Sequence, residues 1–260
     1  MNDINTQVKH RKNKMSMFYA FIYFIGELCL TVSVILGLFI VWQVFYTTWE
    51  VDGLKKQAVE RLHKQSPSSP KIAKNLHFDA PPPIEKPRLG EVFGALYVPS
   101  WGTGTRPMPI GQGSHRAVID KGYAGHYIQT ALPGEIGNFS LAGHRLTYGN
   151  NFDKLPNLAK DDVIAVETKK IWLIYKTTEH EIVTPDRVEV IAPVPNNPYA
   201  VPTSRLMTMT TCSSSTGGRW GNTHRWITHA KFDHWVEKSD GIPAEIAKVY
   251  GKLFIKHKER

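Results

Sequence analysis

The chain has 260 residues, of which 42% are hydrophobic and 21% are charged, which is enough apolar material for one ordinary domain and excludes a disordered protein. Its net charge of +9 lies mostly at the two ends, because residues 1–14 and residues 251–260 each carry four basic side chains and one acidic side chain. A nucleic-acid binding protein gathers its basic side chains on one face of the folded part, so this distribution predicts no nucleic-acid partner.

The first predicted element is a transmembrane helix over residues 15–46. This run contains one charged side chain, Glu27, and exceeds the roughly 20 residues that cross a bilayer. A cleaved signal peptide is the rival interpretation, but its apolar region is about 7–15 residues long. Trp42, Tyr46 and Trp49 are of the type enriched at membrane interfaces. Basic residues precede the run, so we expect a cytoplasmic N-terminus and everything after the helix outside the cell.

Residues 47–88 are expected to form a stalk and a proline-rich linker. Apolar side chains at positions 51, 54, 58 and 62 have the three- and four-residue spacing of a short amphipathic helix. Ser-Pro-Ser-Ser-Pro and Pro-Pro-Pro follow, and proline favours extended backbone. We therefore place the globular domain at residues 89–232. A C-terminal extension, residues 233–260, follows it and includes a possible surface helix over 242–250.

The globular domain is predicted to be mostly β. Short apolar or alternating runs are bounded by glycine, proline and asparagine, a pattern typical of strands: 91–98, 116–119, 137–142, 162–168, 170–177, 181–184, 188–192, 206–211 and 225–232. Open sheet edges invite aggregation, so we expect a closed or nearly closed β-barrel of about eight strands, with short helices in its loops. The stretches 99–115, 143–160 and 193–205 are expected to be loops, the second with a helical turn.

Cys212 is the first candidate for chemistry. It ends a β-prone segment, and Cys29 lies in the apolar run where it cannot pair with it, so the thiol is expected to be free. No second ligand stands nearby at metal spacing, and we predict no metal and no cofactor. A lone cysteine is often an inert buried residue. Against that interpretation, small polar residues follow the cysteine, and Arg219 and Arg225 would favour its thiolate.

A nucleophilic thiol needs a proton partner, and two histidines compete for this role. His144 follows a predicted strand that Gly143 breaks, so it stands at a strand exit, as Cys212 does. His126 is the alternative. Pattern alone does not decide between them.

The motifs around these residues resemble the sortase family, the cysteine transpeptidases of Gram-positive cell surfaces, and are most similar to the class E sortases of actinobacteria. The resemblance covers about residues 91–232. Its main segments are Thr130-Ala131-Leu132-Pro133-Gly134-Glu135, Ala142-Gly143-His144-Arg145, Thr210-Thr211-Cys212 and Arg219-Trp220-Gly221-Asn222-Thr223-His224-Arg225.

By position, the resemblance implies that Cys212 is the nucleophile, His144 the catalytic histidine and Arg225 the catalytic arginine. It also suggests a sorting-signal groove bordered by the 193–205 loop and by four residues of the flanking segments: Thr147, Tyr148, Thr210 and Thr211. For each of these four, a role in turns or core packing is an equal alternative.

The implied activity is cleavage of a C-terminal sorting motif, Leu-Pro-x-Thr-Gly or Leu-Ala-x-Thr-Gly, between Thr and Gly. The implied partners are secreted proteins that carry this motif, an amine acceptor from a cell-wall precursor or a pilin, and the membrane. Three alternatives stay open: a pilin-polymerising sortase, although residues 65–90 show no Asp-Pro-aromatic lid motif; a membrane-anchored hydrolytic cysteine peptidase; and a non-enzymatic surface module with an inert Cys212.

Overall fold

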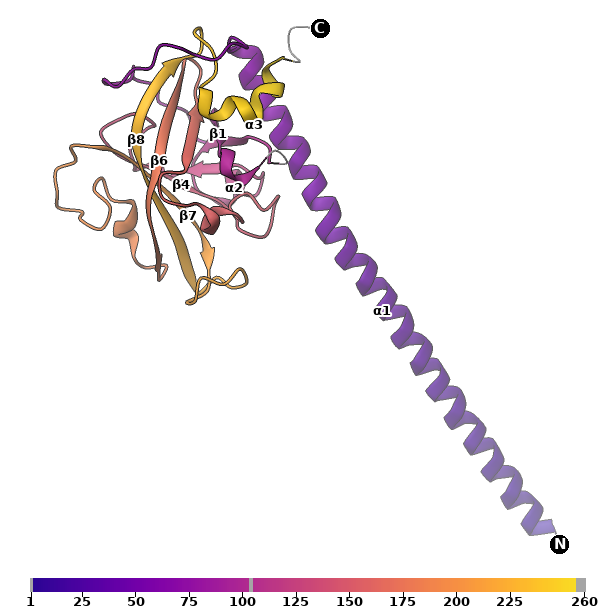
Figure 1. Ribbon diagram of the computed structural model, residues 1–260. Helices are drawn as coiled ribbons and strands as arrows, with labels where there is room; N and C mark the ends of the chain where they lie inside the picture. Colours follow the sequence, from indigo (N-terminus) through magenta and orange to yellow (C-terminus); the bar gives the residue numbers. More distant parts are fainter. Residues whose placement is uncertain (1, 103–104, 256–260) are drawn as a thin grey trace. The chain divides into compact units, whose positions relative to one another are not determined.

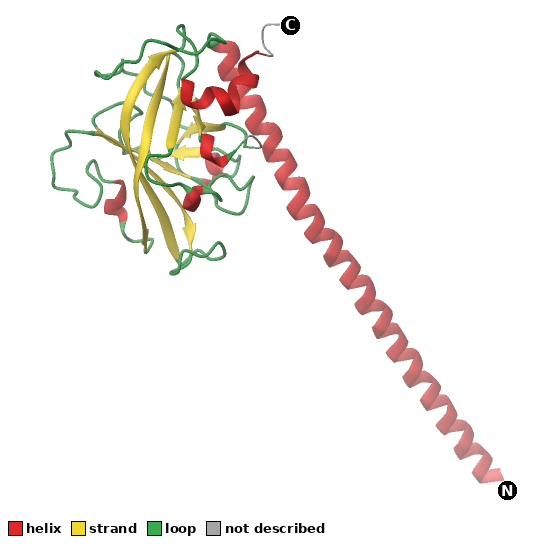
Figure 2. Cartoon of the chain, viewed as in Figure 1, coloured by secondary structure: helices red, strands yellow, loops and turns green. Residues whose placement is uncertain are grey.

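The computed structural model describes the backbone of residues 2–102 and 105–255, and the side chains of that part except those of residues 2–16, 43–49 and 255. Figures 1 and 2 show a β domain and one long helix. The elements in chain order are α1 (Asn2–Gln65), β1 (Val92–Tyr97), η1 (Pro99–Trp101), β2 (Met108–Gln112), α2 (Arg116–Ile119), β3 (Ala124–His126), β4 (Gly137–Ala142), η2 (Leu155–Asn157), β5 (Val163–Glu167), β6 (Ile171–Val183), η3 (Val188–Ile191), β7 (Arg205–Ser213), β8 (His224–Glu237) and α3 (Ala244–Ile255).

The eight strands in the described part of the chain close into a barrel, in the order β1-β2-β3-β4-β7-β8-β6-β5. Two neighbouring pairs, β2 with β3 and β4 with β7, run parallel, and the other pairs are antiparallel. Closure leaves no long unpaired edge, as expected for a mostly β domain. The predicted fold, a barrel of about eight strands with short helices and a preceding apolar helix, is confirmed.

Two of the predicted strands are wrong. The run 116–119 forms the short helix α2, and the run 188–192 largely coincides with the 3-10 helix η3. Only Val118 in the first and Val190 in the second are buried, so each run covers the barrel with one side chain instead of burying a strand face. A run of four or five apolar residues is too short for its periodicity to distinguish these cases.

Strand β2 lies in the stretch 99–115, which the sequence pattern indicates to be a loop, and strand β3 lies outside every predicted strand; both contain glycine. A Cβ on Gly111 would lie 2.6 Å from Cγ1 of Val118, and a Cβ on Gly125 would lie 2.6 Å from the carbonyl oxygen of Gly113. These glycines allow α2 and its flanking loop to approach the sheet closely. The glycines that make these strands hard to predict from the sequence are therefore required by the packing of the strands.

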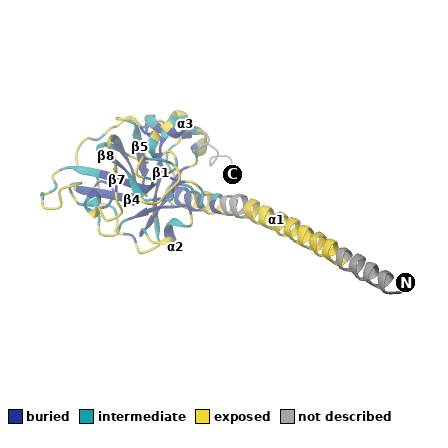
Figure 3. Ribbon diagram, turned by 90° about the horizontal axis from the view of Figure 1, so that it is seen from below, coloured by how far each residue is buried: buried dark blue, intermediate teal, exposed yellow. Residues whose placement is uncertain are grey.

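Apolar side chains form two large buried clusters. Figure 3 shows that the buried residues are concentrated in the barrel. The first cluster includes Phe139, Leu141 and Met209 from β4 and β7, the strands that lead to the candidate site. The second packs Tyr250 and Phe254 of α3 against Trp172 of β6. Helix α3 thus lies on the barrel with one face buried and the other exposed, and its Tyr250 hydroxyl donates to the carbonyl oxygen of Val98.

The chain divides into two compact units, Met1–Thr47 and Thr48–Arg260. In the first unit, residues Met17–Trp42 of α1 form a helical segment long and apolar enough to cross a membrane. The side chains of Tyr46 and Trp49, and those of the basic residues 1–14, lie outside the described part of the chain.

The second unit begins at Thr48, well before Leu89, because the end of α1 and the proline-rich segment both contact the barrel. Residues Ile72 and His77 form β-bridges with Ile242 and Trp235. The predicted amphipathic helix over 50–64 is present as the last part of α1. Strand β8 also continues past the predicted domain end, to Glu237.

A buried polar cluster fastens the end of α1 to the barrel. The Glu167 carboxylate lies 3.0 Å from Nε2 of His63 on α1 and 2.6 Å from Nζ of Lys238. Burial opposes ionisation of Glu167, but the hydrogen bonds and charges of His63 and Lys238 outweigh it and hold the pKa of this carboxyl below its ordinary value. The carboxylate is therefore a charged link between α1, β5 and the turn after β8.

Candidate active site

Cys212 is the penultimate residue of β7, at the edge where the strand leaves the barrel. Its thiol is free and its side chain is partly exposed. In the antiparallel pairing of β7 with β8, Cys212 lies directly opposite Arg225. The cysteine and the arginine that the sequence singles out are therefore cross-strand neighbours.

His144 comes from the strand on the other side of β7. Strands β4 and β7 pair in parallel up to Ala142 and Thr210, so His144 and Cys212 each stand two residues beyond the last pair. The contact continues past this pair, because the Gly143 amide donates to the Thr210 carbonyl at 3.1 Å. The strand ends that carry His144, Cys212 and Arg225 thus lie side by side, at one edge of the barrel.

Two neighbours hold the His144 imidazole. Its Nε2 lies 2.7 Å from Oδ1 of Asp120, the residue that ends α2. Its ring stacks on that of Tyr148, with 4.9 Å between the ring centroids. A carboxylate that binds one ring nitrogen fixes the orientation of an imidazole. Asp120 carries no signal in the sequence, since a tertiary contact alone brings it to His144.

The loop after β4 folds back on itself under His144. The Phe152 amide donates to the His144 carbonyl at 3.0 Å, and the Phe152 ring fills the barrel end below the loop. A Cβ on Gly143 would lie 2.7 Å from that ring. Glycine is therefore needed at the point where the chain leaves β4 and turns over the core.

Arg225 is the second residue of β8, and its Nη1 donates to the backbone carbonyls of Asn222 at 2.8 Å and His224 at 2.9 Å. These bonds fix the guanidinium at the start of the strand that faces Cys212. The planar group keeps further donors in a rigid fork.

Arg145, which follows His144 in the sequence motif, supports the loop after β7. This side chain is 6% exposed, and its guanidinium donates to the carbonyls of Cys212, Gly217 and Gly218 at 2.9–3.3 Å. Burial lowers the pKa of Arg145, and the charge of Asp153 opposes this shift. The residue next to His144 therefore holds the loop that follows Cys212.

A second arginine, Arg219, links the loop after β7 to the loop after β4 at the protein surface. Arg219 makes a two-point contact with Asp153, with Nε 2.8 Å from Oδ1 and Nη2 3.0 Å from Oδ2. This pair is exposed, whereas the Arg145 contacts are buried.

We expect Arg145→Lys to lower kcat/KM by about 10- to 100-fold, because an ammonium cannot reproduce the fork that reaches three separate carbonyls, and charge-assisted bonds contribute about 1.5–3 kcal/mol each. The exposed pair provides a matched control: Arg219→Lys should cost less than about fivefold. Steady-state kinetics on both variants measure the effect. Equal losses, or no loss in Arg145→Lys, would contradict the role assigned to Arg145.

The four candidate groove residues are placed differently from one another. Thr210 and Thr211 are buried, and their hydroxyl groups bond the Tyr127 hydroxyl at 2.9 Å and the Gly143 carbonyl at 2.8 Å, respectively. Thr147 is exposed, and Tyr148 covers the His144 ring. The geometry of the two buried threonines fits a role in holding strand ends together.

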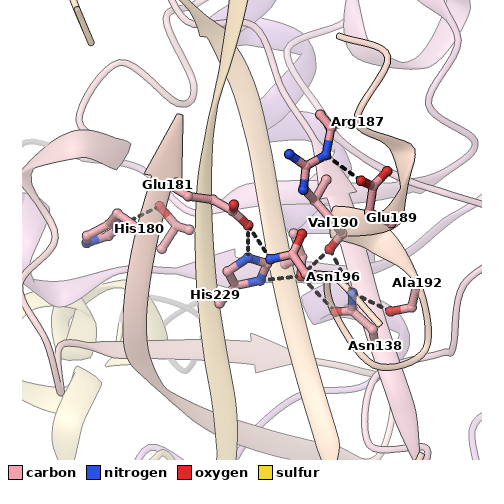
Figure 4. Close-up of polar contacts among 11 residues, drawn as sticks. Asn138, His180, Glu181, Arg187, Glu189, Val190, Ala192, Asn196 and His229 are labelled. Carbon is pink, nitrogen blue, oxygen red and sulfur yellow. Dashed lines mark hydrogen bonds and ion pairs between the residues drawn. The ribbon is translucent and has the colours of Figure 1, made fainter. Parts of the chain in front are cut away.

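The loop between β6 and β7 is anchored at its base by a polar network (Figure 4). Asn138 of β4 donates to the Ala192 carbonyl at 3.0 Å, and Thr208 of β7 donates to Oδ1 of Asn138 at 2.9 Å. Glu181 lies 2.9 Å from Nε2 of His229 and accepts a bond from Asn196 at 2.8 Å.

Burial raises the pKa of Glu181, but its bonds to His229 and Asn196 outweigh this and give a net lowering. The tip of the loop is exposed at Tyr199 and Val201. The loop thus has a fixed base and an apolar, exposed tip.

His126, the competing histidine, lies in the barrel core. It is 1% exposed, with Nδ1 2.7 Å from Oε1 of Gln112 and Nε2 3.0 Å from the Ala131 carbonyl. Its ring packs against Phe139, with 5.2 Å between centroids. These contacts are structural, because both ring nitrogens of this β3 residue are already bonded within the barrel.

His126 provides a test of how acid affects stability. Burial lowers the pKa of His126 to about 4, whereas the pKa of a histidine in the unfolded chain is about 6.5. Between these pH values the unfolded state binds more protons than the folded state. The contribution of His126 to the free energy of unfolding is therefore fully present above pH 6.5, and the free energy of unfolding falls by about 3 kcal/mol as the pH drops to 4. We expect His126→Gln to lack this component. Denaturant unfolding from pH 7 to pH 4 measures it, and identical pH dependence in both proteins would contradict the assignment.

Among the described side chains, no group of three or more His, Cys, Asp or Glu residues is arranged to hold a metal ion. The groups gathered at this edge are a thiol, an imidazole paired with a carboxylate, and a guanidinium. Chemically, this set offers a nucleophile, a proton donor and acceptor, and a fixed cation for a developing negative charge.

Comparison with known proteins connects this arrangement to one family. The family model described as a sortase domain matches residues 96–233. The sortase SrtE1 of Streptomyces coelicolor is 31% identical over 232 residues, which cover 84% of this chain and 59% of that protein. The chain thus spans less than two thirds of the length of this relative. The predicted resemblance to class E sortases is confirmed.

Solved structures give the same result. The SrtA sortase from Actinomyces oris has 49% sequence identity and a TM-score of 0.63, with 66% of this chain and 96% of that chain covered. The sortase E1 of Streptomyces coelicolor, solved with a tripeptide in its active site, has 32% sequence identity and a TM-score of 0.54, with 60% of this chain and 97% of that chain covered.

Proposed function

The chain belongs to the sortase family, whose members are cysteine transpeptidases, and from this premise we propose that it cleaves a C-terminal sorting motif between Thr and Gly and transfers the acyl part to an amine. The observation that carries the proposal is the pairing of Cys212 with Arg225, beside the strand exit that bears His144. The tripeptide in the active site of the related sortase E1 supports a peptide substrate.

In the first half of the reaction, the sulfur of Cys212, whose proton is held by His144, attacks the carbonyl carbon of the motif threonine. The C–N bond to glycine breaks, His144 gives a proton to the departing amine, and a thioacyl enzyme remains. Arg225 donates hydrogen bonds to the oxygen that becomes negative in the transition state. The thioacyl enzyme divides one difficult substitution into two easier steps.

In the second half, an incoming amine attacks the thioester carbonyl and His144 takes up its proton. The C–S bond breaks, and Cys212 leaves as the thiolate. Because Nε2 of His144 is bound to Asp120, we assign proton transfer to Nδ1. For Thr210 and Thr211 we propose a supporting role at the strand ends, and for Tyr148 and Thr147 a place beside the bound peptide.

We propose that Met17–Trp42 anchors the enzyme in the membrane, with the N-terminus cytoplasmic and the barrel outside. Its substrates would be secreted proteins with a Leu-Pro-x-Thr-Gly or Leu-Ala-x-Thr-Gly signal, and its acceptor an amine of a cell-wall precursor or a pilin. Tethering the enzyme to the surface where both substrates are displayed raises their local concentration.

The test uses the purified full-length protein in detergent, peptides with each motif, and a short oligoglycine amine. We expect release of the fragment that begins with glycine, and a ligated Thr-amine product that increases with amine concentration. Hydrolysis without ligation would indicate the hydrolytic peptidase instead. No cleavage, together with a Cys212 thiol that a mild alkylating reagent fails to label, would indicate a non-enzymatic module.

A further inference from the structure

The last part of α1, residues 50–65, packs one of its faces against the barrel domain. One face of it is buried, with Val51, Lys55, Ala58 and Leu62 each less than a tenth exposed. Their spacing of three and four residues is that of one helix side against a surface. A lysine at 6% exposure is unusual in such a face, because lysine is almost never fully buried without a partner.

The partners of Lys55 show where this face is docked. Its Nζ lies 2.7 Å from Oδ1 of Asp52 on the same helix and donates to Oδ1 of Asn151 at 3.2 Å. Asn151 is itself buried and belongs to the loop that begins with His144. The helix therefore makes a direct polar contact with that loop.

Two glycine turns allow the helix to come close. A Cβ on Gly149 would lie 2.9 Å from both Cγ1 of Val51 and Nζ of Lys55, and a Cβ on Gly122 would lie 2.3 Å from Cγ1 of Val51. Both glycines have positive φ, +89° and +73°, so no other residue fits these turns without strain. Val51 is wedged between two turns that are far apart in the sequence.

These two turns carry the two groups that hold His144. Asp120, which binds Nε2 of His144, stands two residues before Gly122. Tyr148, which stacks on the imidazole, directly precedes Gly149. The helix thus supports the carboxylate side and the stacking side of the same ring.

We infer that Val51 and Lys55 are positioning residues for His144, and that the membrane-proximal helix acts as a brace that keeps the imidazole in its working orientation. The inference rests on the proposed function for the task of His144, but the brace itself is a property of the fold. The helix that holds the site is continuous with the proposed membrane anchor. Active protein therefore requires residues 50–65 as part of the catalytic unit.

The first test is kinetic and uses the full-length protein in detergent. We expect Lys55→Met to lower kcat for a Thr-Gly peptide by about 10- to 100-fold with little change in KM, because small displacements of a catalytic group affect the chemical step. Lys56→Met, on the exposed side of the same helix, is the matched control and should be unchanged. Asn151→Ala removes the same contact from the loop side and should match Lys55→Met. The double variant should be no worse than either single variant.

The second test does not depend on activity. Amide hydrogen exchange followed by mass spectrometry should show faster exchange in residues 116–123 and 143–152 in Val51→Ala. In Asn151→Ala the faster exchange should be confined to residues 143–152. Strands β7 and β8 should exchange as in the unmodified protein.

Two results would overturn the brace and leave the proposed function intact. One is unchanged hydrogen exchange in both segments in Val51→Ala. The other is an unchanged kcat in Lys55→Met when the unmodified protein cleaves the peptide. Conversely, faster exchange in a protein that never cleaves peptide would support the brace and count against the proposed function.

Discussion

Replacing Cys212 with alanine is expected to lower the rate of peptide release by at least about 1,000-fold, because the sulfur is the atom that bonds to the substrate and no other group replaces it. Release of a quenched Thr-Gly reporter peptide measures the loss. The side chain is small and lies at a strand end, so the variant should keep the barrel and its pairing with β8.

The chain provides its own control for this variant. Cys29→Ala removes the other thiol, which lies in the apolar part of α1, and should cleave normally. Turnover by Cys212→Ala at the rate of Cys29→Ala would remove Cys212 from the mechanism.

His144→Ala is expected to lower kcat by about 100- to 10,000-fold, the range that a general acid and base contributes. Binding of the peptide should change little, because the imidazole acts on the leaving and incoming amines. Steady-state kinetics give kcat and KM separately. The loss should persist across pH, since alanine offers no group that transfers a proton in place of the imidazole.

His115 is the matched control for His144. It is an exposed histidine at the start of α2, close in sequence to Asp120, and His115→Ala should retain normal kinetics. A fully active His144→Ala protein would mean that the wrong base was assigned.

The fold class could be predicted because strand periodicity is a local property of the sequence. The strands that were found, such as β5 and β6, are rich in β-branched and aromatic residues. Strands β2 and β3 could not be found, because Gly111 and Gly125 resemble loop residues until their close contacts with α2 and the loop at Gly113 are known. Whether a short apolar run becomes a strand or a helix depends on such tertiary contacts.

The candidate site divides in the same way. Cys212, His144 and Arg225 could be selected because each stands at a strand end in a recognisable motif. Asp120, Arg145 and Lys55 could not, because their roles depend on distances across the fold. Of these three residues, Arg145 was the easiest to identify from the sequence, since it directly follows His144.

Trapping the covalent intermediate tests the mechanism most directly. The full-length protein would be mixed with a Leu-Ala-x-Thr-Gly peptide, quenched in acid and analysed by intact mass and by peptide mapping. We predict an added mass equal to the peptide up to its threonine, located on the fragment that contains Cys212, and removed when an amine is supplied. Cleaved peptide without any adduct on Cys212, or an adduct that maps to another residue, would contradict the account.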